Sequence, residues 1–499
     1  MFLDQKFRTG PQTEIRRIDA HYVKSHSMNI FDLPTEVLTE IVCQCNNLAI
    51  SETCKTFSAV THSTPSLWTT VILHPRQFTI DGPDFLRARI LRTKGAMLNV
   101  CIGLVTERTK EVLALCKLLA EYNAQIREFA LTAHTVFLAG GVVYDIFPNA
   151  GVFQALEVLS ILSESESDYL LNPIWPRLDM ILADATNTFP NLQKLHMNSF
   201  YDCVPMLPLS ASFSHLSTLV LNGSCEDEIA YPALIAAFLN CTPQLESLWM
   251  KHDNWQNHHD LTPPTASGVV KGRPGSEISL DIRLPRLRHL AVSVPGTACD
   301  LIGCITAPMV EDLHLDGSRE PQFEGGRMDD EWNDEDTTTA RNALRRFASR
   351  CRNVRRFAVT RTYLSRNVWD WIMFGEDEKG PPFPMLECIA LHEIYDVEWS
   401  GFDDELLEKF AREPSLPLKR LALLCCDFPL HASTVVEAFR ASGAKEFECD
   451  EYVPQWEAEE WEQLEELGVS LTYWEASEVV EDEWWTCGLY IDVADSGAY

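Results

Sequence analysis

Two adjacent histidines between an amide and a carboxylate, in Asn257-His258-His259-Asp260, have the clearest capacity for chemistry in this sequence. Imidazole nitrogens and carboxylate oxygens bind transition metals, so the cluster could hold a metal ion. Adjacent histidines in a loop more often form a solvated stretch, and the residues that follow are rich in proline and glycine. We therefore expect no metal site and no cofactor, and we rank an enzyme built on this cluster below the two functions considered at the end of this section.

Motifs of other chemistries are missing from the sequence. It has no glycine-rich phosphate loop, no His-Glu-x-x-His pair and no nucleophile elbow. The close cysteine pairs Cys43/Cys45 and Cys425/Cys426 lack the second pair of ligands that a zinc site requires. The 16 cysteines are scattered along the chain, as is typical of reduced thiols. The sequence therefore identifies no catalytic residue, and we expect a protein that is not itself an enzyme.

A short phrase recurs through most of the chain, and Leu216-Ser-Thr-Leu219-Val-Leu221-Asn222 is its best example. Its template is an apolar residue, two free positions, an apolar residue, one free position and an apolar residue. Such recurrence indicates a stacked array, because each unit must bury its apolar side against its neighbours. The copies begin at Ile126, Leu156, Leu192, Leu216, Leu245, Leu287, Val310, Val354, Leu386 and Leu418.

Helices are expected in the intervals between these phrases. In four intervals an apolar pair precedes a phenylalanine by three residues, and this spacing places the side chains on one helical face. The phenylalanines are Phe238, Phe347, Phe410 and Phe439. Because the first three stand seven or eight residues before the next strand, the repeated unit is predicted to be helix, turn, strand.

The recurring phrase resembles the leucine-rich repeat in an irregular form, over roughly Cys101–Cys449. Only Asn198 and Asn222 keep the asparagine that the family places after its strand. The resemblance implies an α/β repeat solenoid, a leucine-rich-repeat horseshoe, which we assign to residues 76–449. Insertions are expected near 258–277 and 320–338, and the proline and glycine content of Leu261–Gly275 predicts neither helix nor strand there.

A small helical module precedes the array, at residues 29–75. A helix is predicted to begin at Pro34, since proline is favoured at the first helical position, with Val37, Leu38 and Ile41 on one face. A second helical segment follows Cys54, and Pro65-Ser-Leu-Trp68 forms a third. Three such short helices make a core too small to be stable alone, so the module is expected to need a partner.

The order of these elements resembles an F-box, over about Asn29–Ile72. Phe57 stands where tryptophan is commoner in the family, and the first two helices are a few residues closer together. In the family this module binds a Skp-type adaptor, which bridges to a cullin. By that resemblance, the candidate adaptor contacts are Leu33, Pro34, Val37, Leu38 and Ile41. Alternatively, any of these side chains could simply pack inside the module.

The two ends of the chain differ in composition from the rest. Residues 1–28 lack apolar periodicity and a secretory apolar core, so we expect a disordered arm in which Met28 could be an alternative start. Residues 450–499 combine 15 acidic residues with several tryptophans and contain no lysine or arginine. So many large aromatic residues favour a cap over the last repeat, because the open end of a stack exposes its core.

Charge and hydropathy limit the possible partners. The formal net charge is −32, and much of it lies in residues 450–499 and in the acidic stretch Glu324–Asp336. Nucleic-acid binding needs clustered basic residues and is therefore not expected. No apolar run is long enough to cross a membrane. We expect a cytoplasmic or nuclear protein whose partners are other proteins.

The predicted strands define a surface. If the leucines of each phrase point inward, the alternating residues point outward. Trp249 stands near the middle of this surface, and a tryptophan among polar residues is typical of a binding hot spot. Alternatively, the proline-rich insertion that follows Trp249 could cover it. The residues we select for partner binding are Lys194, His196, Trp249, Lys251, His314, Arg356 and His392. The other outward positions are Asn198, Thr218, Val220, Asn222, Ser247, His289, Ala291, Ser293, Asp312, Asp316, Ala358, Thr360, Cys388 and Ala390, with Glu128 and Arg420 at the two ends.

Together these features predict a substrate-recognition subunit of an SCF-type cullin ubiquitin ligase. The F-box would bind the adaptor, and the concave strands would bind an unknown protein substrate. A second possibility is a non-catalytic leucine-rich-repeat scaffold in which the F-box-like helices cap the array. Capture of a Skp-type adaptor separates the two, because the scaffold is expected to be a stable monomer without one.

Overall fold

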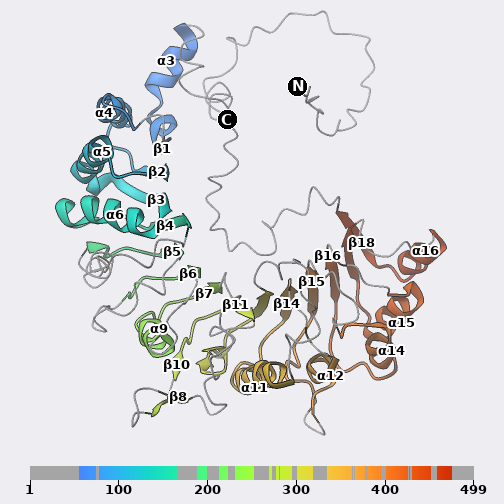
Figure 1. The fold of residues 1–499 in the computed structure, drawn as a ribbon. Coiled ribbons are helices and arrows are strands. Elements are labelled where there is room, and N and C mark those ends of the chain that lie inside the picture. Colours follow the sequence, from blue (N-terminus) through green and yellow to red (C-terminus); the bar gives the residue numbers. More distant parts are fainter. Residues whose placement is uncertain are drawn as a thin grey trace, which may run out of the picture. The chain divides into compact units, whose positions relative to one another are not determined.

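The computed structural model describes residues 55–474, with gaps of which those longer than five residues are 166–187, 199–212, 223–230, 252–268, 295–300, 318–333, 395–400 and 451–457 (Figure 1). The chain divides into two compact units, with the boundary between Thr69 and Thr70. Residues 92–94 also belong to the first unit. The second unit contains the strands and almost all the described helices.

The second unit is built on a 14-stranded sheet in which each strand pairs in parallel with its neighbours. The strand order follows the sequence, so each unit of the array lies beside the next one along the chain. The strands are β1 (Thr70–Leu73), β2 (Leu98–Val105), β3 (Ile126–Thr135), β4 (Val158–Ser165), β5 (Lys194–Asn198), β6 (Thr218–Asn222), β7 (Ser247–Lys251), β11 (His289–Val294), β13 (Asp312–Gly317), β14 (Arg356–Thr360), β15 (Cys388–His392), β16 (Arg420–Leu424), β17 (Glu446–Asp450) and β18 (Ser470–Trp474).

All ten predicted phrases form strands of this sheet, β3 to β7, β11 and β13 to β16. Their pairing keeps one register, so the second apolar position of each phrase lies beside the same position of the next. For example, Leu219 pairs with Leu248, and Leu248 pairs with Leu290. The prediction of an α/β array with a long parallel sheet is therefore confirmed.

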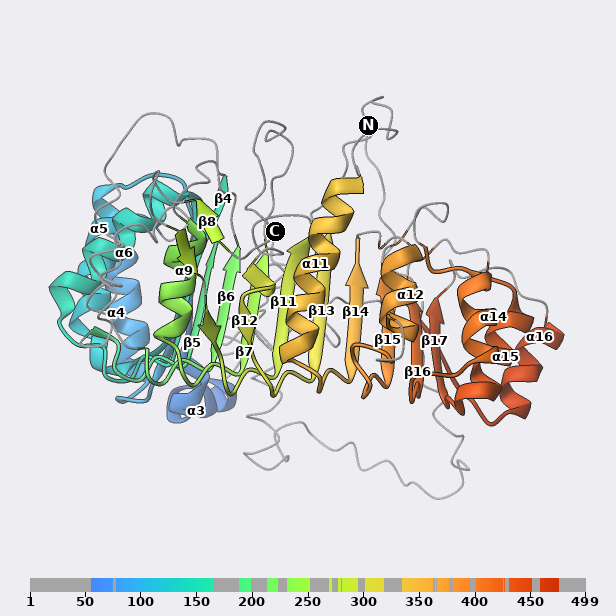
Figure 2. The ribbon, with the colours of Figure 1, turned by 90° about the horizontal axis from the view of Figure 1, so that it is seen from below.

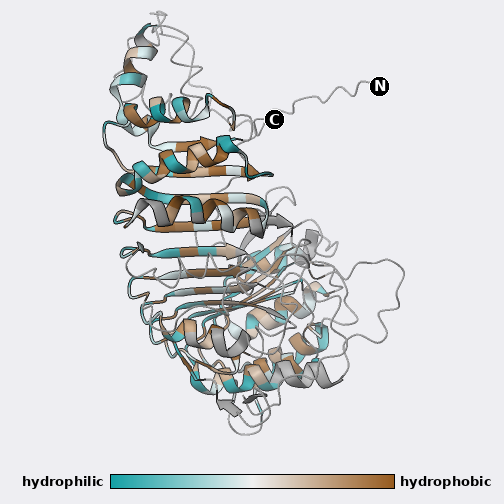
Figure 3. Ribbon diagram, turned by 60° about the vertical axis from the view of Figure 1, so that its left-hand side comes forward, coloured by the Kyte–Doolittle hydropathy of each residue, from teal (hydrophilic) through white to brown (hydrophobic). Residues whose placement is uncertain are grey.

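The leucines of the phrases form the core. All three apolar positions of each of the ten phrases are buried. Together these residues belong to one continuous hydrophobic cluster. Because side chains alternate along a strand, the residues between them point to the other side of the sheet. Figure 3 shows hydrophobic residues recurring in successive strands of the array.

Helices connect most of these strands and lie on one side of the sheet (Figure 2). They are α4 (Gly82–Arg92), α5 (Lys110–Glu121), α6 (Val136–Ala150), α9 (Tyr231–Asn240), α11 (Asp334–Arg350), α12 (Arg366–Phe374), α14 (Asp404–Arg412), α15 (Ala432–Ser442) and α16 (Ala458–Glu466). The four predicted phenylalanines lie on α9, α11, α14 and α15 and are buried, as their spacing required. Phe439 of α15, for instance, meets Phe447 of β17 edge to face at 5.7 Å.

A turn of fixed form introduces most strands of the array. The backbone N–H of the first phrase residue donates to a carbonyl three residues earlier, as in Leu192 to Phe189 and Leu216 to Phe213. The phenylalanine of this turn is buried, so the turn adds a residue to the core. Asn191 and Asn353, one residue before their phrases, each donate to a backbone carbonyl of the preceding unit at 2.7 Å. These hydrogen bonds link neighbouring units outside the sheet ladder.

Charges of alternating sign line the positions just before six successive strands. They are Glu246, Arg288, Glu311, Arg355, Glu387 and Lys419, and the backbone N–H of each residue after the first donates to the carbonyl of the one before. Glu387 Oε1 lies 3.5 Å from Arg355 and 2.9 Å from Lys419. Opposite charges on adjacent strands favour this register over a slipped one.

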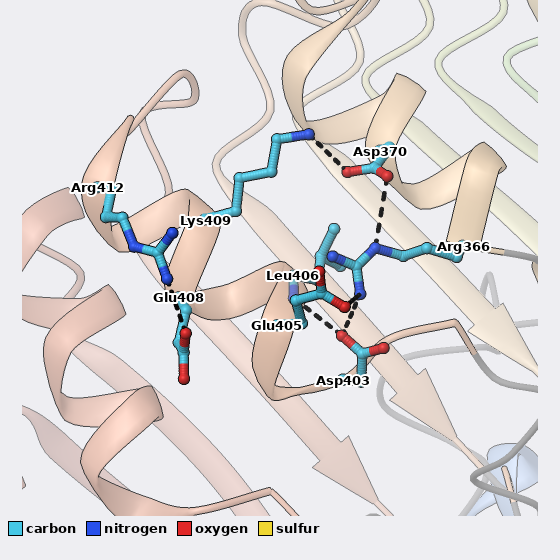
Figure 4. Close-up of polar contacts among 8 residues, drawn as sticks. All are labelled: Arg366, Asp370, Asp403, Glu405, Leu406, Glu408, Lys409 and Arg412. Carbon is cyan, nitrogen blue, oxygen red and sulfur yellow. Dashed lines mark hydrogen bonds and ion pairs between the residues drawn. The ribbon is translucent and has the colours of Figure 1, made fainter.

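Polar contacts also join the adjacent helices α12 and α14 within the helical layer (Figure 4). Arg366 of α12 pairs with Asp403, which stands just before α14 and caps it by accepting from the Leu406 N–H at 2.8 Å. Lys409 of α14 donates to Asp370 of α12 at 2.8 Å. These contacts tie the helical layer together in the way that the ladder of strands ties the sheet.

The array extends beyond the residues we assigned to it. Thr70–Leu73, at the end of the expected F-box module, forms β1, and α16 and β18 form a further helix and strand inside the expected C-terminal cap. The phrase template missed β17 and β18 because Ala444 and Gly468 occupy its first position, where it requires a larger apolar residue. The remaining part of the cap lies outside the described residues.

The prediction that Leu261–Gly275 contains no strand was wrong. Val269–Lys271 forms β8, which pairs antiparallel with β9 (Glu277–Ser279). Two β-branched valines favour a short strand even between glycines. Of the second insertion, near 320–338, the structure describes only the last residues, which belong to α11.

The described part of the first unit contains α3 (Lys55–Ser63) and the 3₁₀ helix η2 (Pro65–Trp68). Trp68 is buried, and its indole N–H donates to the carbonyl of Thr61 at 2.8 Å. Its ring stacks on His62 at 6.0 Å, and Arg92 lies over it at 4.4 Å. The two predicted helical segments after Cys54 are therefore present, whereas the helix expected at Pro34 lies outside the described residues.

Replacing Asp403 by alanine should lower the free energy of unfolding by about 1–2 kcal/mol, because both the α14 cap and the Arg366 pair are lost. Asp403→Asn retains a capping oxygen and should cost roughly half as much. Glu405→Gln, at an exposed side chain 3.9 Å from Arg366, is the control and should change stability by less than about 0.5 kcal/mol. Urea unfolding measures all three, and equal effects of Asp403→Ala and Glu405→Gln would contradict the assignment.

Candidate interaction face

The side of the sheet opposite the helices carries the outward residues of the strands, and we call it the strand face. Parallel pairing arranges these residues in rows that cross the strands. The first row contains Lys194, Thr218, Ser247, His289, Asp312, Arg356, Cys388, Arg420 and Glu446. The middle row contains Ser160, His196, Val220, Trp249, Ala291, His314, Ala358, Ala390, Ala422 and Glu448. The third row contains Ser293, Asp316, Thr360, His392 and Leu424.

Trp249 and His314 form the aromatic centre of the middle row. Their rings meet edge to face with centroids 5.9 Å apart, across the intervening strand β11. His314 Nε2 lies 3.0 Å from Thr360 Oγ1, which fixes the plane of the imidazole. Trp249 is half-buried, and its indole nitrogen is shielded from water without a hydrogen-bond partner among the described residues. An indole N–H left in this way can donate to an oxygen of a bound molecule.

His196 lies in the middle row on β5, two strands before Trp249. Its Nδ1 is 3.4 Å from Ser160 Oγ on the adjacent strand. Burial lowers the pKa of His196 to about 4, because the charged imidazolium loses its hydration. His196 is therefore neutral at pH 7 and serves as a hydrogen-bonding group, not as a cation.

The first row holds a compact ion network on β11, β13 and β14. Asp312 lies between His289 and Arg356 and bonds to both side chains. Burial would raise the pKa of Asp312, but the hydrogen bonds from His289 and Arg356 outweigh it and lower that pKa. The Arg356 side chain is 55% exposed although it is paired. Of the selected residues whose side chains the structure describes, Arg356 alone is exposed to solvent.

Two carboxylates share one guanidinium at the β16–β17 end of the face. Arg420 pairs with Glu448 and lies 3.7 Å from Glu446. Glu448 is 6% exposed, and its second oxygen, Oε2, is buried without a hydrogen-bond partner in the described part of the chain. These three side chains carry one positive and two negative charges, a net charge of −1.

The third row is more buried than the sequence suggested. Asp316 is 1% exposed and is held by Arg361 at 3.0 Å, and His392 is 3% exposed. His392 is thus part of the packed end of β15, not an open side chain. The backbone of Lys251 ends β7, but the position of its side chain lies outside the description, as do all five candidate adaptor contacts.

The selected residues do not form one patch. Trp249, His314 and Arg356 lie within four neighbouring strands, β7 to β14, while Lys194 and His196 lie two strands away on β5. Selecting side chains by type also left out Asp312, Arg420 and Glu448. Asp312 was among the outward residues and could have been chosen from its register between two basic neighbours. Glu448 was missed because β17 does not match the phrase.

Within the described ranges, no group of three or more His, Cys, Asp or Glu side chains is arranged to hold a metal. No helix in the same ranges is long and apolar enough to cross a membrane. The His258-His259 cluster lies in the gap at 252–268.

Comparisons with known proteins add little to this description. No family model matches the sequence, and no curated protein matches it. Among the solved structures that match is the crystal structure of a protein from Bacteroides fragilis, with 14% identity over 60% of this chain and 70% of that one. Its TM-score is 0.32, too low to carry an argument. The class of the protein is therefore defined by its own coordinates: an α/β protein with a long parallel sheet of repeated units.

The burial of His196 predicts a pH dependence. Because its pKa in the folded protein is lower than the ordinary value of 6.5, its contribution to stability is present above pH 6.5 and is lost as the pH falls toward 4. His196→Gln cannot titrate, so its stability should decline less between pH 7 and 5 than that of the unaltered protein. His215→Gln, at an exposed site before β6, is the control. Urea unfolding at both pH values tests this, and parallel declines in all three proteins would refute it.

Proposed function

We propose that this protein is the substrate-recognition subunit of an SCF-type cullin ubiquitin ligase. In this proposal the array is a leucine-rich-repeat solenoid, and the N-terminal unit is an F-box that binds a Skp-type adaptor. The observation that carries the proposal is the combination of a separate N-terminal unit with a strand face that presents register-aligned side chains.

The N-terminal unit supports the first half of the proposal. Pro65-Ser-Leu-Trp68 is the last motif of the sequence that resembles the F-box, and these residues form a short helix in which Leu67 and Trp68 are buried. Phe57 of α3 packs against them. Such a small core would gain stability from binding a second protein through Leu33, Pro34, Val37, Leu38 and Ile41.

The strand face supports the second half. Its centre offers a half-buried tryptophan whose indole N–H has no hydrogen-bond partner among the described residues and, nearby, an accessible arginine held in position by Asp312. Tryptophan and arginine are the residues that most often dominate the energy of protein interfaces. From β5 to β18 the strands of the face have five or six residues and keep one register, so a partner would meet a preorganised surface.

The proposed activity needs no catalytic residue in this chain. A substrate protein would bind to the strand face of this subunit, and the subunit would be attached to the ligase. A lysine of the substrate would thereby be positioned near a conjugating enzyme. The encounter then becomes effectively intramolecular, and its rate depends on position and effective concentration. The specificity would lie in the side chains of the strand face.

One observation favours the alternative of a scaffold whose N-terminal helices cap the array. The chain passes from η2 into β1 through the single residue Thr69. A terminal module so closely joined to a solenoid could serve as its cap. The two functions differ in whether an adaptor binds.

Leu33→Ala combined with Pro34→Ala should reduce capture of a Skp-type adaptor at least tenfold, because two candidate contacts of the F-box are lost. The measurement is co-purification of the full-length chain with purified adaptor. The control combines Ile80→Ala with Leu91→Ala, which removes exposed apolar side chains elsewhere and should leave capture unchanged. If the unaltered chain is a stable monomer that captures no adaptor, the scaffold is the correct function.

Trp249→Ala should weaken binding of a substrate, once captured, by about 2 kcal/mol or more, since truncation of a central tryptophan commonly has this effect. Trp249→Phe retains most of the aromatic area and loses the indole donor, so it should cost less. Met385→Ala, at an exposed site before β15, is the control. Substrates identified by affinity capture and mass spectrometry can be measured by calorimetry, and unchanged affinity of Trp249→Ala would place the binding site elsewhere.

A further inference from the structure

The middle row of the strand face changes character between β14 and β17. Ala358, Ala390 and Ala422 lie side by side on three adjacent strands, and the next residue in the row is Glu448. No side chain longer than a methyl group stands in this part of the row. A backbone could approach the sheet closely there, as it could not over a row of large side chains.

Glu448 gives this row a chemical preference. One of its oxygens accepts from Arg420, and the other is buried and lacks a donor among the described residues. A buried carboxylate oxygen without a donor is unfavourable in the free protein, and a bound donor would remove that cost. The neighbouring Glu446 side chain is 56% exposed and belongs to the same strand, so a group arriving from solvent meets it first.

The charge at this end favours a cation over a neutral donor. Glu446 and Glu448 both pair with the guanidinium of Arg420, so these three side chains together carry a net charge of −1. The network of His289, Asp312 and Arg356, in contrast, already pairs its carboxylate with an arginine. A formal net charge of −32 would also accelerate the association of a basic partner.

We propose that the middle row binds an extended segment of a partner protein that carries lysine or arginine, with the cation held by Glu446 and Glu448. This inference rests on the proposed function and specifies the class of substrate. The segment crosses Ala358, Ala390 and Ala422 and reaches Trp249 at the other end. From Trp249 to Glu448 the row spans six strand spacings, roughly 29 Å, which about nine extended residues cover.

The test uses the full chain and two probes, a fluorescein-labelled (Ala-Lys)5 amide and the same peptide with every lysine acetylated. Fluorescence anisotropy at physiological salt should show at least tenfold tighter binding of the charged peptide. Glu448→Gln should weaken that binding at least fivefold, because a charge-assisted bond is lost, and Glu446→Gln should weaken it less. The control, Glu128→Gln, removes a carboxylate from the same face on β3 and should leave the affinity unchanged.

A steric variant provides a second readout if Glu448→Gln does not fold. Ala358→Leu introduces a large side chain into the row without changing any charge, and it should also weaken the charged peptide at least fivefold. The proposal is overturned if the folded variants bind as Glu128→Gln does, since the acidic segments would then hold the peptide. It is equally overturned if the unaltered chain binds neither peptide or binds both alike.

The same samples separate this inference from the proposed function. Glu448→Gln should capture the Skp-type adaptor as well as the unaltered chain does, because Glu448 lies in the second unit. Failure of adaptor capture by the unaltered chain would reject the ligase function and leave the peptide result standing. Loss of peptide binding without loss of adaptor capture would be the expected behaviour of a substrate-site variant.

Discussion

The structure depends on one constraint: no helix-strand unit of this chain can bury its own apolar side. Each strand places two or three leucine-like residues toward the helices, and these are buried only because the next unit repeats the pattern in the same register. Three features maintain that register: the parallel pairing, the turn before most strands, and the hydrogen bonds that Asn191 and Asn353 donate to the preceding unit. The arrangement of the strand face follows directly, since the outward residues are aligned by the same pairing.

Sequence reasoning succeeded where a pattern is local. Three apolar residues at fixed spacing identified ten strands, and the phenylalanine spacing identified four helices, because burial on one face imposes both periods. It failed where the local pattern weakens: Ala444 and Gly468 stand in the first position of the phrase, so β17 and β18 were not recognised. Their packing is supplied by neighbours, as Phe439 and Phe447 show.

The candidate site was harder to predict because it depends on contacts between distant units. The pairing of Trp249 with His314 requires two strands 65 residues apart to be placed with one strand between them. The burial of His392, and the sharing of Arg420 by Glu446 and Glu448, likewise depend on neighbouring strands. Strand alternation predicts which residues face outward. It does not predict which of them are accessible or already paired.

The alternation of charge before the strands limits how such an array can change in length. Loss of the unit that carries Arg355 would bring Glu311 beside Glu387, so two like charges would face each other at the new junction. Loss of two consecutive units, with Glu311 and Arg355, would instead set Arg288 beside Glu387 and preserve attraction. In this part of the protein, insertions and deletions should therefore be tolerated in even numbers of repeats, which makes a pair of repeats the natural step of its evolution.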